Sequence, residues 1–147
     1  MIFDRINIIR CYGRVPYMDD FRYKSVLLVD DSYVDNLINR KMLQASYFAG
    51  DITVIDSPIK ALAYLQQCVN EGTLPEVIFL DIRMPEMDGF TFLESLNGIT
   101  DIESSDLKIY MLSSSLDPDD LKQIAENDLV SKFISKPLTE KILNEIE

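Results

Sequence analysis

From residue 25 onward, short apolar runs alternate with longer segments in which apolar residues recur at helical spacing. The apolar runs are rich in β-branched residues, which is typical of strands buried on both faces of a parallel sheet. They predict strands over residues 25–29, 51–55, 76–80, 107–112 and 132–135. The amphipathic segments predict helices over residues 33–48, 57–70, 89–97, 117–127 and 138–147. This alternation indicates an α/β fold, a doubly wound five-stranded parallel sheet with helices on both faces.

Several predicted helices begin with residues that favour helix N-termini. Ser32 precedes the segment 33–48, where its hydroxyl can accept a hydrogen bond from the first turn. The segments 57–70 and 117–127 each open with a capping residue followed by proline, which suits the first helical position. These signals support the predicted starts of three helices.

Residues 1–23 differ from the rest of the chain and are predicted to be an N-terminal extension to a domain that spans residues 24–147. Ile2, Ile6 and Ile9 fall on one helical face, which is compatible with a short amphipathic helix. The alternative is a disordered extension with no regular structure. The sequence leaves both interpretations open.

Composition and charge exclude several classes of function. Hydrophobic residues make up 47% of the chain and charged residues 27%, which is ordinary for a globular protein. The formal net charge of −11 argues against direct DNA binding, because that requires clustered lysine and arginine. The chain has no histidine, which excludes histidine-based acid/base catalysis and most zinc sites.

Cysteine usage and hydropathy bear on the cellular compartment. Cys11 and Cys68 have neither the spacing of a metal site nor the density of a disulfide framework, so a cytoplasmic protein is expected. No apolar run approaches the roughly 20 residues of a membrane-spanning helix, so no membrane association is expected.

Polar residues that could bind a ligand or take part in catalysis follow four of the five predicted strands. In a doubly wound sheet, ligands bind outside the carboxyl ends of the strands, so residues at these positions are expected to converge. They are Asp30 and Asp31, Asp81, the serines at 113–115, and Lys136 with Pro137. The sequence therefore predicts one cluster built from distant parts of the chain.

The chemistry of this cluster points to a cation and a phosphoryl group. Three neighbouring carboxylates repel one another, so such a site either raises a pKa or recruits a cation. Mg²⁺ is the expected ion, because it prefers oxygen ligands and often binds carboxylates together with phosphate. Lys136 and Ser113 could hold phosphoryl oxygens, and a carboxylate could act as nucleophile to form an aspartyl phosphate.

Each motif alone has an ordinary structural explanation. The sequence DDS before a helix commonly provides a cap, MDG commonly forms a turn, and KPL can simply begin a helix. Together they occur at successive strand ends, in the order Asp-Asp, Asp, Ser, Lys-Pro. Independent loops are not expected to produce that order.

Four motifs resemble the receiver domain of two-component response regulators. They are VLLVDDS, VIFLDIRMPEMDG, MLSSS and FISKPL, and the resemblance extends from Lys24 to the last residue. It implies a flavodoxin-like receiver fold with strand order 2-1-3-4-5. It also implies Mg²⁺ as cofactor and a phosphoryl group donated by a histidine of a partner, either a sensor histidine kinase or a histidine phosphotransfer protein.

The resemblance also implies a metal site around the phosphoacceptor. Asp81 would be the phosphoacceptor and, with the other acids, a metal ligand. Asp31 would bind Mg²⁺ directly, and Asp30 would act largely through bound water. The backbone carbonyl of Arg83 would be a further ligand, and its long side chain at the mouth of the site could alter access for the attacking water.

A second group of residues would respond to the phosphoryl group. The resemblance implies that Lys136 pairs with phosphoryl oxygens and that Pro137 follows a cis peptide bond, which proline permits at low cost. Ser113 would supply the switch hydroxyl, with Ser114 as the alternative. Phe133 occupies the position of an aromatic residue that turns inward on activation, although simple strand packing explains it equally well.

The expected function is that of a phosphoacceptor in a two-component system or phosphorelay. Phosphorylation of Asp81 would switch a protein-interaction surface formed by residues 117–127, 132–135 and 138–147. The chain ends directly after its last predicted helix, so a stand-alone receiver acting on an unidentified effector is expected. It would not be an enzyme, apart from self-phosphorylation by small donors and autodephosphorylation.

Two alternative functions come from other classes. The first is a Mg²⁺-dependent phosphohydrolase with Asp81 as nucleophile. Arg83 counts against it, because such enzymes typically need a carboxylate two residues after the nucleophile. The second is a binding module that retains the pocket but works without phosphorylation.

Overall fold

The sheet and its helices follow the predicted alternation. The structure is a computed structural model that describes residues 20–99, 102, 105–115 and 117–146. The strands are β1 (Tyr23–Val29), β2 (Ala49–Ile55), β3 (Val77–Asp81), β4 (Lys108–Ser113) and β5 (Val130–Ser135). The helices are α2 (Tyr33–Ala45), α3 (Pro58–Glu71), α4 (Gly89–Asn97), α5 (Pro118–Glu126) and α6 (Glu140–Glu145).

All five strands are parallel and form one sheet in the order β2-β1-β3-β4-β5. The predicted fold class and strand order are therefore confirmed. Because every strand runs in the same direction, the loops that follow β1, β3, β4 and β5 leave the sheet at one edge. This is the edge at which the sequence predicts the functional cluster.

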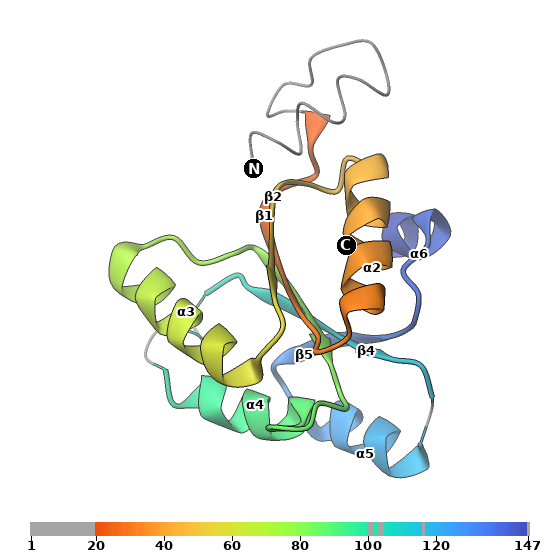
Figure 1. Ribbon diagram of the computed structural model, residues 1–147. Coiled ribbons are helices and arrows are strands. Elements are labelled where there is room, and N and C mark those ends of the chain that lie inside the picture. Colours follow the sequence, from red (N-terminus) through yellow and green to blue (C-terminus); the bar gives the residue numbers. More distant parts are fainter. Residues whose placement is uncertain (1–19, 100–101, 103–104, 116, 147) are drawn as a thin grey trace.

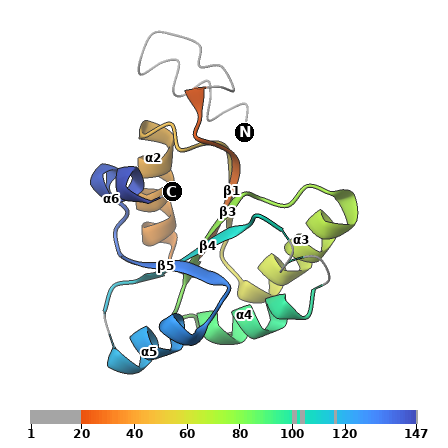
Figure 2. The same ribbon diagram turned by 180° about the vertical axis from the view of Figure 1, so that it is seen from behind.

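Helices cover the sheet on both sides, as Figures 1 and 2 show, with α2 and α6 on one face and α3, α4 and α5 on the other. Alternate strand residues point to opposite faces and build two separate cores. Leu27, Ile78 and Met111 pack in the core under α3 and α4. Leu28 and Phe79 pack in the core under α2 and α6. This double burial explains why the strands are continuous apolar runs.

Helix starts agree with the capping signals in the sequence. The side chain of Ser32 accepts a hydrogen bond from the N–H of Asp35, three residues further along the chain in α2. Ser57 accepts a hydrogen bond from the Lys60 N–H in α3, and Asp117 accepts one from the Asp119 N–H in α5, each ahead of a proline. Side-chain caps of this kind satisfy backbone donors that have no partner inside the helix.

Some predicted element ends are wrong by a few residues. The helix predicted over residues 33–48 ends at Ala45, because Tyr47 adopts a positive φ of 51° that no α-helix accommodates. The last helix covers Glu140–Glu145 and not residues 138–147, since Thr139 is its N-cap. The last strand begins at Val130, two residues before the predicted start.

The fold extends slightly further toward the N-terminus than residue 24, since β1 begins at Tyr23. Phe21 is buried and packs against Tyr47, with ring centroids 5.9 Å apart. Arg22 Nη1 donates a hydrogen bond of 2.5 Å to the carbonyl of Leu143. Ile2, Ile6 and Ile9, on which the possible amphipathic helix rests, and Cys11 lie outside the described residues.

None of the helices in the described part of the chain is long and apolar enough to cross a membrane.

Candidate functional site

Three carboxylates meet at the carboxyl edge of the sheet. Asp30 follows β1 and Asp81 ends β3, so the pairing of these two strands brings them together. Oxygen atoms of Asp30, Asp31 and Asp81 lie within 4.8 Å of one another. Asp30 and Asp81 are 2% and 5% exposed, whereas Asp31 is exposed. The edge therefore carries a compact acidic cluster with Asp31 on its solvent side.

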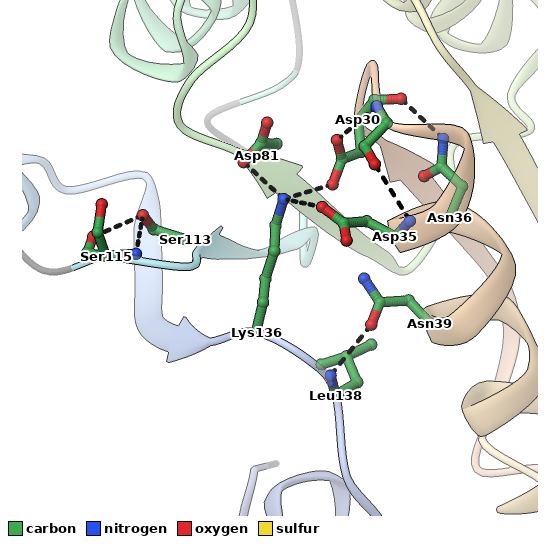
Figure 3. Close-up of polar contacts among 10 residues, drawn as sticks. Asp30, Asp35, Asn36, Asn39, Asp81, Ser113, Ser115, Lys136 and Leu138 are labelled. Atoms are coloured by element: carbon green, nitrogen blue, oxygen red, sulfur yellow. Dashed lines mark hydrogen bonds and ion pairs between the residues drawn. The ribbon is translucent and has the colours of Figure 1, made fainter.

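Lys136 places a cation in this cluster from the loop after β5. Its Nζ atom lies 2.7 Å from Asp30 Oδ2, 2.9 Å from Asp35 Oδ2 and 3.0 Å from Asp81 Oδ1. Figure 3 shows the extended side chain pointing at all three carboxylates. The peptide bond between Lys136 and Pro137 is cis. The ammonium group thus balances part of the negative charge at the sheet edge.

Two asparagines of α2 connect this helix to the loops that follow β1 and β5. Asn36 Nδ2 donates a hydrogen bond of 2.7 Å to the carbonyl of Asp30. Asn39 Oδ1 accepts a hydrogen bond of 3.0 Å from the N–H of Leu138, which ties the loop that carries Lys136 to α2 (Figure 3). Both asparagines are buried, where a backbone group without a partner would be costly.

The predicted switch residues lie on β4 and β5. Ser113 Oγ donates a hydrogen bond of 2.6 Å to the carbonyl of Ser115 and accepts one of 3.2 Å from the Ser115 N–H. Ser113 is buried and Ser114 is exposed. Phe133 pairs with Met111 in the sheet and packs, partly buried, against the core. The Ser113 hydroxyl is therefore engaged by its own loop.

Arg83 lies two residues after Asp81, and its side chain turns toward α5. Its Nη2 atom lies 2.5 Å from Asp120 Oδ2 and 4.0 Å from Asp117 Oδ2. The Asp120 side chain is only 7% exposed, while that of Arg83 is 57% exposed. The long cation therefore links the loop after β3 to the first turn of α5.

Replacing Arg83 by alanine is expected to destabilise the fold. The substitution leaves the buried Asp120 carboxylate without this guanidinium partner, at a cost of about 1–2 kcal/mol because the pair is partly exposed. Urea unfolding followed by circular dichroism measures the change. Adding Asp120→Asn should restore much of the loss, since an amide needs no counter-charge. An Arg83→Ala variant as stable as wild type would contradict the expectation.

Burial and charge shift the pKa values of the two central groups. Burial raises the pKa of Asp81 to about 6; the hydrogen bond from Lys136 opposes this rise, and the Asp30 charge adds to it. For Lys136, burial acts to lower the pKa, but hydrogen bonds to Asp30, Asp35 and Asp81 outweigh burial and raise it above its ordinary value. Lys136 is therefore charged at neutral pH, while Asp81 loses its proton at a higher pH than an ordinary aspartate.

The raised pKa of Asp81 predicts that Asp81→Asn stabilises the metal-free protein at neutral pH. The folded state holds the Asp81 proton up to about pH 6, whereas the unfolded chain releases it near the ordinary value of 3.8. The contribution of Asp81 to the free energy of unfolding of the wild type is therefore lost as the pH rises from 3.8 to about 6. The gain in Asp81→Asn should be about 2 kcal/mol at neutral pH and should shrink toward zero near pH 4.

Urea unfolding in the presence of a chelator, repeated across this pH range, measures the effect. Asp56→Asn is the matched control, because Asp56 is an exposed acid after β2. A gain in Asp81→Asn that does not change with pH would contradict the expectation.

Several contacts at and around the candidate site are not predictable from the sequence patterns. Asp35 matches an ordinary first-turn acid of a helix, yet it contacts Lys136. Asp120 likewise matches a first-turn acid of α5. The MDG motif predicts only a turn at Gly89, whereas a Cβ at this position would lie 2.8 Å from the Asp81 carbonyl oxygen. For Asp35 and Asp120, the only signal in the sequence is that each follows a helix N-cap residue, Ser32 or Asp117, by three positions.

The fold and this edge define a class, the flavodoxin-like α/β domains with an acidic site at the carboxyl ends of the strands. Within that class, the family model "Response regulator receiver domain" matches residues 26–146. The chain therefore belongs to the response regulator receiver domain family, the receiver modules of two-component signal transduction.

Individual relatives agree with the family. The two-component response regulator ORR1 of Oryza sativa is 32% identical over 120 residues, covering 79% of this chain and 50% of the rice protein. The chain thus spans about half the length of that relative. A two-component response regulator from Cytophaga hutchinsonii has a similar structure, with a TM-score of 0.78, 30% identity, and coverage of 84% of this chain and 92% of that one.

A further neighbour is the receiver domain of the histidine kinase CKI1 from Arabidopsis thaliana, whose crystal structure is a complex with Mg²⁺. It has a TM-score of 0.73 at 23% identity and covers 90% of this chain and 97% of that one. At this level of identity the likeness concerns the fold.

Proposed function

We propose that this chain accepts a phosphoryl group on Asp81 from a phosphohistidine of a partner protein. The observation that carries the proposal is the position of the Lys136 ammonium, 3.0 Å from Asp81, beside the acidic cluster. A carboxylate with a fixed cation at its side is suited to nucleophilic attack on phosphorus. Membership of the receiver family supports the same role.

The acidic cluster fits Mg²⁺. Its donors are the carboxylate oxygens of Asp30, Asp31 and Asp81, all within 4.8 Å, and hard divalent cations prefer oxygen ligands. The backbone carbonyl of Arg83 is the proposed further ligand. A bound Mg²⁺ would supply positive charge that offsets the repulsion between the carboxylates and the incoming phosphate.

Asp81 and Lys136 have separate roles in the proposed reaction. One carboxylate oxygen of Asp81 forms a bond to phosphorus while the phosphorus–nitrogen bond of the donor breaks, and the histidine nitrogen retains the electron pair. Lys136 holds the developing negative charge of the phosphoryl oxygens. The product is an aspartyl phosphate on a carboxylate that is 5% exposed and partly shielded from water.

Ser113 and Phe133 would transmit the change. Ser113 exchanges its hydrogen bond with the Ser115 carbonyl for one to a phosphoryl oxygen, which draws the loop after β4 toward Asp81. Phe133 then repacks against the core, and the surface of α5, β5 and α6 changes. That surface is the proposed contact for a downstream protein.

The surface near the site is compatible with a protein donor, either a sensor histidine kinase or a histidine phosphotransfer protein. Exposed apolar side chains lie on α2, which also carries Asp35. Tyr33 is 79% exposed, Val34 59%, Leu37 42% and Ile38 45%. Clusters of exposed apolar residues commonly mark surfaces that bind other proteins.

The proposal is tested by incubating the full chain with acetyl phosphate and Mg²⁺ and measuring intact mass. We expect one hydroxylamine-sensitive phosphate on wild type and none on Asp81→Asn, because the nucleophilic oxygen is replaced by an amide. A chelator should also prevent labelling. Label that persists in Asp81→Asn would overturn the assignment. Unlabelled wild type would favour a phosphorylation-independent binding module, and steady turnover of an aryl phosphate would favour a phosphohydrolase.

A further inference from the structure

The hydrogen-bonding capacity of Lys136 is fully used in this structure. An ammonium group has three N–H donors and no acceptor. Asp30, Asp35 and Asp81 each place a carboxylate oxygen at 2.7–3.0 Å from Nζ, which matches the three donors one to one (Figure 3). A phosphoryl oxygen on Asp81 can therefore gain a donor from Lys136 only if one of these contacts is given up.

Asp35 differs from the other two partners in its place and its exposure. It lies in the first turn of α2, whereas Asp30 and Asp81 lie at the ends of strands of the sheet. Its side chain is 37% exposed, compared with 2% for Asp30 and 6% for Asp81. Water can therefore replace the lysine at Asp35 at the lowest cost, since solvation of a released carboxylate depends on its access to solvent.

The approach of Asp35 to the lysine is fixed by local contacts. Ser32 Oγ accepts a hydrogen bond of 3.2 Å from the Asp35 N–H, and the Ser32 N–H donates one of 2.9 Å to Asp30 Oδ1. These bonds join the end of β1 to the first turn of α2. Asp35 also lies outside the group of acids that could share a metal ion, which consists of Asp30, Asp31 and Asp81 among the described residues.

We infer that Asp35 is a positioning residue that competes with the phosphoryl group for Lys136. It holds the ammonium group in the resting site and releases it when a phosphoryl group is present on Asp81. This inference rests on the proposed phosphoacceptor function and adds a regulatory role for a residue outside the metal and phosphate ligands. The Asp35 contact stabilises the unmodified state, so its loss should favour the phosphorylated one.

The test uses beryllofluoride, an analogue of the phosphoryl group, titrated with Mg²⁺ into the full chain and followed by NMR. We expect Asp35→Asn to bind beryllofluoride about fivefold more tightly than wild type or better, because a neutral amide competes less well for Lys136. Asp56→Asn is the matched control. It removes the same charge from an exposed acid near the site and should change affinity less than about twofold.

A double-mutant cycle separates competition from simple loss of charge. In a Lys136→Gln background, Asp35→Asn should no longer tighten beryllofluoride binding, because the group for which Asp35 competes is absent. Equal tightening with and without Lys136 would show a general charge effect and overturn the inference.

A second readout needs neither metal nor phosphate. In the metal-free protein, hydrogen exchange of the ¹⁵N-labelled Lys136 ammonium should be faster in Asp35→Asn than in wild type. Unchanged exchange would contradict the proposed resting contact. Thermal unfolding of the metal-free variant establishes that it is folded.

The outcomes distinguish this inference from the proposed function. If wild type fails to bind beryllofluoride with Mg²⁺, the phosphoacceptor proposal fails. If wild type binds and Asp35→Asn binds equally or more weakly, the phosphoacceptor proposal stands and the competing role of Asp35 is overturned.

Discussion

Lys136→Met is expected to slow phosphorylation of Asp81 by about 100-fold or more, since loss of one preorganised charge-stabilising donor commonly costs that much. The methionine keeps an unbranched apolar side chain that reaches as far as the lysine Cε but removes the ammonium group that lies 3.0 Å from Asp81. Intact mass measured over time with acetyl phosphate and Mg²⁺ reports the rate. Lys132→Met on β5 is the control, because Lys132 is exposed to solvent.

The same substitution should also destabilise the metal-free protein. Asp30 and Asp81 remain buried without the lysine, and breaking a buried ion pair on one side costs about 3 kcal/mol or more. Adding Asp30→Asn should recover part of this loss, because one of the two buried charges is then removed. The expectation would be wrong if Lys136→Met were phosphorylated at the wild-type rate or unfolded at the wild-type urea concentration.

Gly89→Ala is the second substitution for which we expect a large effect. A Cβ at this position would lie 2.7 Å from Met111 Cε, 2.8 Å from the carbonyl oxygen of Asp81 and 3.2 Å from the Cα of Ile82. The methionine can move, but the two backbone atoms belong to the end of β3, which carries Asp81. Overpacking of this kind should cost about 2–3 kcal/mol and displace Asp81 from its partners.

Urea unfolding and the acetyl phosphate assay measure the two consequences. Gly98→Ala, at the other end of α4, is the matched control. There, the nearest atom to the added Cβ is the Ser95 carbonyl oxygen at 3.3 Å, and the backbone is right-handed. We expect the free energy of unfolding of Gly98→Ala to stay within about 0.5 kcal/mol of the wild-type value. A Gly89→Ala protein with normal stability and labelling would show that α4 can shift without cost.

The strands and the location of the site follow from short-range features of the sequence. Burial on both faces makes each strand an apolar run, so the end of each run marks the sheet edge. Asp30, Asp81 and Lys136 stand at such ends, and a parallel sheet must bring them to the same side. The amino-acid pattern alone therefore groups residues that lie far apart in the chain.

The contacts that tune the site depend on how helices are placed against the sheet. Nothing in the sequence distinguishes Asp35 from other acids that favour the first turn of a helix. Its contact with Lys136 arises because α2 packs beside the loop that follows β5, where Asn39 holds Leu138. Asp120 likewise contacts Arg83 only because α5 starts beside the loop after β3. Short-range patterns carry no information about such placements.

The long separation between the acids and their lysine has a consequence for biosynthesis. Asp30 and Lys136 form an ion pair although they lie 106 positions apart. A ribosome delivers the N-terminal part of a domain first. The nascent chain therefore presents Asp30, Asp31 and Asp81 before it contains Lys136, and the strand that completes the sheet precedes this lysine directly. Pairing of β5 with β4 therefore completes the sheet and brings the positive charge of Lys136 to the acidic edge.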